Sequence, residues 1–89
     1  VTGRLFVFNA NGDSLYAVDF DRSRGLYGLE LSSDGSIAVV STYDVISIFE
    51  DGVLRDTIPN YGQTTAKVSG DGNRIVKGDF NGNVTLYEW

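Results

Sequence analysis

The stretch LELSSDGSIAVVSTYDVISIFE, residues 29–50, decides the fold class. Short runs of valine, isoleucine and phenylalanine, which favour strands, are separated by turn dipeptides. The same Asn-Gly or Asp-Gly pairs recur along the chain, at residues 11–12, 34–35, 51–52, 71–72 and 81–82. These pairs accept the positive φ angles of type I′ hairpin turns. No window has a convincing 3.6-residue apolar period, so the sequence predicts an all-β protein.

One phrase occurs three times, as GRLFVFN at residues 3–9, VISIFE at residues 45–50 and GNVTLYE at residues 82–88. Internal repeats of this kind indicate a fold built from similar units. The aligned positions form three columns: Leu5, Ile46 and Val84; Val7, Ile48 and Leu86; and the aromatic residues Phe8, Phe49 and Tyr87.

A second phrase also repeats, as GLYGLELSSDGS at residues 25–36 and GQTTAKVSGDGN at residues 62–73. The run that follows it, IAVVS at residues 37–41, aligns with RIVKG at residues 74–78. Together the two phrases predict nine strands, at about residues 4–9, 14–20, 27–32, 37–42, 45–50, 53–58, 64–69, 74–78 and 83–88.

Repeats of about 40 residues with four strands each have the period of a β-propeller blade. The sequence therefore predicts four-stranded antiparallel blades, about two and a quarter of them, in a single segment 1–89. Residues 3–24 would form two strands of one blade, residues 25–61 a complete blade, and residues 62–89 three strands of the next.

Blades pack both faces on neighbouring blades, so two blades alone would leave two apolar faces uncovered. We expect the chain not to be a stable monomer, but to associate with other copies or to belong to a longer propeller. Nine strands rather than eight favour the second alternative. The chain starts with valine and has no methionine, which suggests a processed product, a tag-cleaved product or a piece of a longer protein.

The phrase GRLFVFNANGDSLYAVDF, residues 3–20, resembles the repeat of quinoprotein-like (PQQ-like) β-propellers, and residues 29–50 resemble the WD40-like surface-protein propellers of prokaryotes. There are departures. Phe49-Glu50 and Tyr87-Glu88 stand where WD40 repeats carry Trp-Asp. Leu15-Tyr16 and Leu54-Arg55 occupy the region of the quinoprotein docking tryptophan. The resemblance implies a propeller fold that serves as a scaffold or binding surface, without the quinone or calcium site.

The composition argues against several function classes. The net charge is −5 and the seven basic residues form no cluster, which disfavours nucleic acids and anionic membranes as partners. No apolar run is long enough to cross a membrane. The chain has no histidine and no cysteine, which removes the usual base or ligand of serine-triad, cysteine–histidine and zinc sites. Location stays open, with an extracellular or a cell- or virion-surface setting favoured by the acidic balance.

Some stretches are rich in oxygen-bearing side chains, as metal sites and acid–base sites are. The stretches at residues 9–13 and 79–83 space oxygen ligands as calcium loops do, but neither supplies a full set, and a hairpin turn is the preferred interpretation. The acidic residues form two sets in the sequence: Asp19 with Asp21, and Asp44 with Glu50 and Asp51. We interpret both sets as solvated acidic surface rather than as a glycosidase-like pair of catalytic carboxylates.

Three other motifs have structural interpretations as well. Gly70-Asp71-Gly72 lacks the helix and the Lys-Ser/Thr pair of a phosphate loop and is predicted to be a hairpin turn. Asn83-Val84-Thr85 fits the N-glycosylation sequon, but it starts a strand, and modification would require export. The aromatic column Phe8, Phe49 and Tyr87 is predicted to pack between blades.

We therefore expect a non-enzymatic structural or protein-interaction module, with no catalytic, cofactor-binding or metal-binding residues and no cofactor. Its partners would be other propeller blades, of further copies or of a parent chain, and other proteins. Two alternatives remain open: a lectin-like propeller that binds a small ligand or carbohydrate, and a fragment of a quinoprotein-type enzyme.

Overall fold

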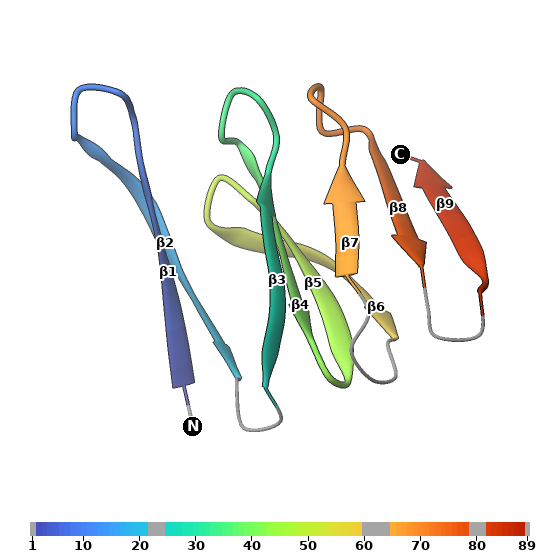
Figure 1. The fold of residues 1–89 in the computed structure, drawn as a ribbon. Helices are drawn as coiled ribbons and strands as arrows, with labels where there is room; N and C mark the ends of the chain where they lie inside the picture. Colours follow the sequence, from blue (N-terminus) through green and yellow to red (C-terminus); the bar gives the residue numbers. More distant parts are fainter. Residues whose placement is uncertain (1, 22–24, 60–64, 79–81, 89) are drawn as a thin grey trace.

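The computed structural model describes residues 2–21, 25–59, 65–78 and 82–88. These residues form nine strands and no helix, which confirms the all-β prediction (Figure 1). The strands are β1 (Thr2–Phe8), β2 (Ser14–Asp21), β3 (Leu26–Leu31), β4 (Ile37–Thr42), β5 (Val45–Glu50), β6 (Val53–Pro59), β7 (Thr65–Val68), β8 (Arg74–Gly78) and β9 (Val84–Glu88). Their ends differ from the sequence-predicted ends by at most two residues.

The strands form three antiparallel sheets, each built from consecutive strands. The first sheet pairs β1 with β2, the middle sheet has the order β3-β4-β5-β6, and the last sheet has the order β7-β8-β9. Figure 1 shows the three sheets side by side, with the middle sheet between the other two. Consecutive pairing is expected because short turns connect nearly all neighbouring strands.

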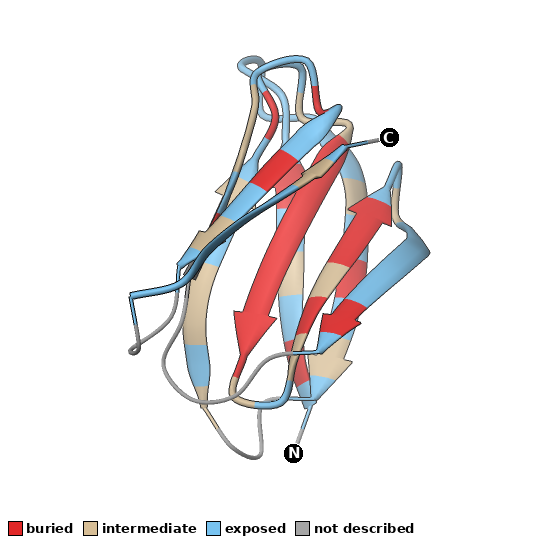
Figure 2. Ribbon diagram, turned by 90° about the vertical axis from the view of Figure 1, so that its right-hand side faces the viewer, coloured by how far each residue is buried: buried red, intermediate tan, exposed pale blue. Residues whose placement is uncertain are grey.

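Strand β4 lies at the centre of the core, and side chains on both of its faces are buried (Figure 2). Toward the last sheet the buried cluster is made of Ile37, Val39, Ile46, Ile48, Ile58, Ala66 and Ile75. Toward the first sheet it is made of Val18, Ala38, Val40 and Phe49. A strand covered on both faces has apolar residues at consecutive positions, which explains the unbroken run IAVV at residues 37–40.

The turn type was predicted correctly at only one of the described turns. Asp51 and Gly52 both have positive φ angles, 51° and 90°, as a type I′ turn requires. In the turns at residues 11–12, 34–35 and 71–72 only the glycine has a positive φ, so the type I′ prediction is wrong there. Residue 81 lies outside the described residues, so its turn type stays a prediction.

Side-chain hydrogen bonds explain these other turns. In the β1–β2 loop, the Asn9 carbonyl accepts from Gly12 N at 3.0 Å, and Asn9 Oδ1 accepts from the backbone N of Asn11 and of Asp13, both at 3.0 Å. The Asn9 side chain thus accepts from two backbone donors of the loop. Asn9 N donates to the carbonyl of Asp13 at 3.0 Å, so three residues, 10–12, rather than two lie between this hydrogen-bonded pair.

Candidate interaction surfaces

The outward face of the first sheet carries exposed aromatic side chains. Leu5 and Val18 pack toward the middle sheet, so strand alternation places Phe6 and Phe8 on the opposite side. Their rings stack with centroids 6.4 Å apart, and the two residues are 54% and 58% exposed. We call this surface the first outer face; it consists of Arg4, Phe6, Phe8, Ala17 and Asp19.

One ion pair borders these aromatic rings. Arg4 and Asp19 are opposite each other in the β1–β2 register. Arg4 Nε donates to Asp19 Oδ1 at 2.6 Å, and Arg4 Nη2 donates to Oδ2 at 3.2 Å. The hydrogen bond, together with the opposite charges, raises the pKa of Arg4 and lowers the pKa of Asp19. Both side chains are exposed, so the pair contributes to orientation more than to stability.

The outward face of the last sheet is apolar at its centre. Ile75 and Tyr87 pack toward the middle sheet, so the alternate residues Val76 and Leu86 point the other way and lie opposite each other in the register. Val84, farther along β9, is 73% exposed, and Leu86 is 57% exposed. We call this surface the last outer face; it consists of Lys67, Arg74, Val76, Val84, Leu86 and Glu88.

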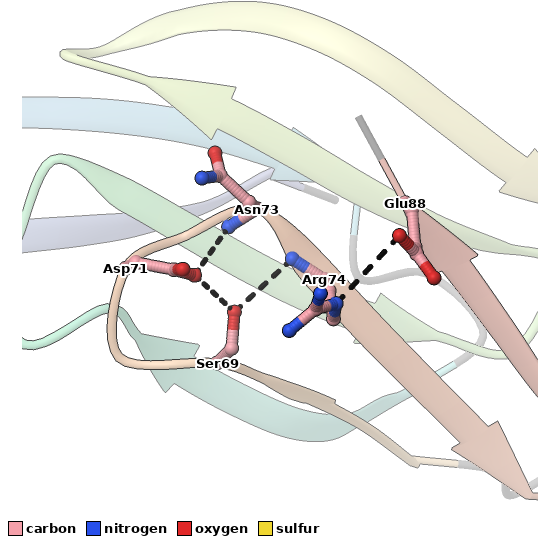
Figure 3. Close-up of polar contacts among 5 residues, drawn as sticks. All are labelled: Ser69, Asp71, Asn73, Arg74 and Glu88. Carbon is pink, nitrogen blue, oxygen red and sulfur yellow. Dashed lines mark hydrogen bonds and ion pairs between the residues drawn. The ribbon is translucent and has the colours of Figure 1, made fainter.

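Charged side chains border this second apolar surface as well. Arg74 Nε lies 3.7 Å from Glu88 Oε2, and the two residues are register partners on β8 and β9 (Figure 3). Lys67 Nζ reaches back to Glu30 Oε2 of the middle sheet at 3.3 Å. Apolar residues surrounded by exposed charges are typical of a surface that another protein covers.

The prediction that the aromatic column packs between sheets is right for two of its three members. Phe49 is only 7% exposed against the first sheet, and Tyr87 packs on the core between the middle and last sheets. Phe8 is exposed on the first outer face of the single chain, so its packing between blades stays a prediction. The reason is that no other strand of the described residues lies against that face.

The hairpin tips at one end of the stack repeat the same hydrogen bonds. Ser69 Oγ donates to Asp71 Oδ1 at 2.6 Å and accepts from Arg74 N at 3.1 Å, and Asn73 N donates to Asp71 Oδ1 at 3.0 Å (Figure 3). These donors lower the pKa of Asp71. The segment Gly70-Asp71-Gly72 is therefore the β7–β8 turn, as predicted.

The β3–β4 tip has the equivalent arrangement. Ser32 Oγ donates to Asp34 Oδ1 at 2.9 Å and accepts from Ile37 N at 3.0 Å, and Ser36 N and Oγ donate to the same carboxylate oxygen. These hydrogen bonds lower the pKa of Asp34. Ser33 joins the two tips, because its N and Oγ donate to the carbonyl of Gly70 at 2.9 and 2.7 Å.

Tyr16 joins the first and middle sheets. Its hydroxyl donates to the carbonyl of Gly35 at 2.5 Å, and a Cβ at Gly52 would lie only 3.1 Å from Tyr16 Cβ. Partial burial raises the pKa of Tyr16, and the nearby charges of Asp51 and Asp34 raise it further. The sequence does not predict this contact; the resemblance only aligns Leu15-Tyr16 with the region of the quinoprotein docking tryptophan.

The structure places the weighed carboxylates in turns and on exposed strands. The Asp13 carboxylate accepts from Asn9 Nδ2 at 3.4 Å, the Asp19 carboxylate pairs with Arg4, and the Glu50 carboxylate lies 3.7 Å from Arg55. Asp21 and Asp44 each have a polar interaction of their own. Within residues 2–21, 25–59, 65–78 and 82–88, no three acidic side chains gather as a metal site would need. Of the second calcium-loop candidate, residues 79–81 lie outside the described residues.

Sequence reasoning missed Phe6 and the outward orientation of Phe8. The signal was present, because Arg4, Phe6 and Phe8 alternate with the inward residues Leu5 and Val7, which makes β1 apolar on both faces. A strand of this kind predicts that something packs on each side of it.

The part of the chain that the structure describes contains no helix long and apolar enough to span a bilayer. No protein-family model matches the chain, and a search of curated proteins found no match either.

Proposed function

We propose that this chain is a non-enzymatic protein-interaction module. Its sheets would be propeller-type blades, and its two outer faces would bind further sheets, either of other copies or of the rest of a larger protein. The resemblance of residues 3–20 and 29–50 to propeller repeats supports this interpretation.

One observation carries the proposal: repeat-equivalent residues are buried inside the stack and exposed on its outside. Ile46 and Ile48 of the middle sheet are fully buried, at 0% exposure. Val84 and Leu86, which occupy the same repeat positions, are among the most exposed apolar residues described. These repeat positions are therefore apolar both in the middle sheet, where a neighbouring sheet covers them, and in the last sheet, where nothing described does. This supports the view that another sheet covers the outer faces as well.

The proposal predicts that the chain associates through these faces. Light scattering would measure the weight-average mass of the wild type over a concentration series, beside a double variant with Phe8→Ser and Leu86→Ser. We expect the wild type to exceed the monomer mass at micromolar concentration and the double variant to return toward it, because each serine removes an exposed apolar side chain from one outer face.

Val53→Ser is the matched control. Val53 is 70% exposed but lies on β6 of the middle sheet, outside both outer faces, so the change should leave the mass as in the wild type. A wild type that stays monomeric throughout the series, with the same mass as the double variant, would contradict the proposed function.

A further inference from the structure

The internal repeat relates the two outer faces to interfaces that already exist within the chain. Phe8 occupies the repeat position of Phe49 and Tyr87. Phe49 packs on Val18 of the preceding sheet, and Tyr87 packs on the cluster that includes Ile48 of the preceding sheet. In both cases the aromatic side chain faces the sheet that comes before its own in the chain.

The last outer face has the converse relation. Val84 and Leu86 occupy the repeat positions of Ile46 and Ile48, and these isoleucines are buried against Ile75 of the following sheet. Leu5 of the first sheet occupies the repeat position of Ile46, and it packs against the cluster that includes Ala38 and Val40 of the middle sheet. In the first sheet and in the middle sheet, the residues at these repeat positions therefore face the sheet that follows their own in the chain.

We infer that the last outer face of one copy binds the first outer face of a second copy, in head-to-tail order. Phe8 of the second copy would lie beside Val84 and Leu86 of the first, as Tyr87 lies beside the cluster of Ile46 and Ile48. The contact continues the interface that joins the first to the middle sheet and the middle to the last sheet. This inference rests on the proposed function and specifies which surfaces meet.

Head-to-tail contact is heterologous: each copy uses two different surfaces, so added copies continue the stack and end in a ring where the rotation closes. Two other arrangements bring different residues together. Two-fold packing would place one outer face on the same face of its partner. Pairing of the free edges of β1 or β9 would extend a sheet, and then neighbouring residues of β9 would be equally close to the partner.

Cysteine cross-linking distinguishes these arrangements, because the chain has no cysteine of its own. Phe8→Cys protein, isotope-labelled to identify it by mass, is mixed with unlabelled Leu86→Cys protein and treated with a short bis-maleimide. We expect the mixed product to exceed its statistical share, and each variant alone to give little product. Circular dichroism checks that each variant is folded, and Phe6→Cys with Val84→Cys serves as a second pair.

Thr85→Cys is the matched control for Leu86→Cys. Thr85 is also exposed and lies on the same strand, but alternation places its side chain on the opposite face of the sheet. Replacing Leu86→Cys by Thr85→Cys should therefore abolish the mixed product.

Each other outcome overturns the inference. Predominant Phe8–Phe8 or Leu86–Leu86 products would show two-fold packing, and equal products from Thr85→Cys and Leu86→Cys would show edge pairing. Absence of product from both pairs, while the wild-type mass exceeds that of a monomer, would also overturn it. Two-fold packing leaves the proposed function standing, because the outer faces are still covered. In the other two cases the proposed function stands if the Phe8→Ser, Leu86→Ser double variant returns toward the monomer mass, and falls if it does not. Monomeric wild-type mass overturns the proposed function as well.

Discussion

A single side chain, Tyr16, provides a polar contact between the first and middle sheets. The side chain comes from β2, and its hydroxyl reaches the carbonyl of Gly35 at a hairpin tip. Its ring sits against Gly52, where a larger residue would be crowded. Among the described residues, the apolar cluster between the two sheets has four buried members, so one partly buried hydrogen bond is a considerable part of that interface.

We expect Tyr16→Phe to destabilise the protein by about 1 kcal/mol, the typical net contribution of one hydrogen bond. The ring and its packing are retained, so the loss reports on the contact with Gly35. Urea unfolding at neutral pH, followed by circular dichroism, measures the difference. An unchanged free energy of unfolding would show that this hydrogen bond contributes nothing.

The same variant gives a pH prediction. The pKa of Tyr16 is raised in the folded state, so folding favours the neutral phenol. The stabilisation is fully present below the ordinary tyrosine pKa of about 10 and is lost as the pH rises through the higher folded value. The advantage of the wild type over Tyr16→Phe should therefore shrink in alkali. An advantage that grows above pH 10 would contradict the assignment.

At the scale of the element, the hairpin tips show why turn residues cannot be exchanged freely. Gly72 has a φ of +78°, and a Cβ there would lie 2.6 Å from Cγ1 of Ile37 in the middle sheet. Gly12 has a similar φ of +85°, but nothing lies within 4 Å of the equivalent Cβ. The two glycines therefore separate backbone strain from steric crowding between sheets.

Gly12→Ala should cost roughly 1–2 kcal/mol, because an L-residue is strained in the left-handed region. Gly72→Ala should cost roughly 1–3 kcal/mol more, since the added methyl group also forces β4 and the β7–β8 tip apart. Denaturant unfolding of both variants measures the difference. Equal losses would mean that the β7–β8 tip does not pack on Ile37 as described.

The strands could be predicted from sequence because the signal is local. Runs such as IAVVS and VISIFE lie between turn dipeptides. Each run also has a repeat partner later in the chain, so the same strand ends are predicted from two stretches of sequence. The turn types could not be predicted, because they depend on side-chain hydrogen bonds to the backbone. At the β3–β4 turn, Ile37 N donates to Ser32 Oγ and Ser36 N donates to Asp34 Oδ1, and these bonds compete with the two-residue turn.

The candidate surfaces were predictable as a class but not as residues. Two uncovered apolar faces followed from the expected stacking of sheets. The repeat alone treated Phe8 and Phe49 as equivalent, yet one is exposed and the other buried. Burial depends on which sheet lies opposite, and a column of aligned residues contains no information about that neighbour.

At the scale of the whole molecule, three sheets form an open stack, and one buried apolar cluster joins the middle sheet to each of its two neighbours. The flanking sheets are each covered on one side by described residues, and each presents apolar residues on the other. Such a stack has no inherent end, so its solubility depends on what covers the two outer faces.

The central claim is that both outer faces are covered in the assembled protein. Hydroxyl-radical footprinting of the unsubstituted chain, read by mass spectrometry at low and high protein concentration, tests it most directly. We predict that oxidation falls with concentration at Phe6, Phe8 and Leu86, while Val53 and Leu54 on β6, which are at least as exposed as Phe6, keep their reactivity. Oxidation of Phe6, Phe8 and Leu86 that stays constant at every concentration would contradict the claim.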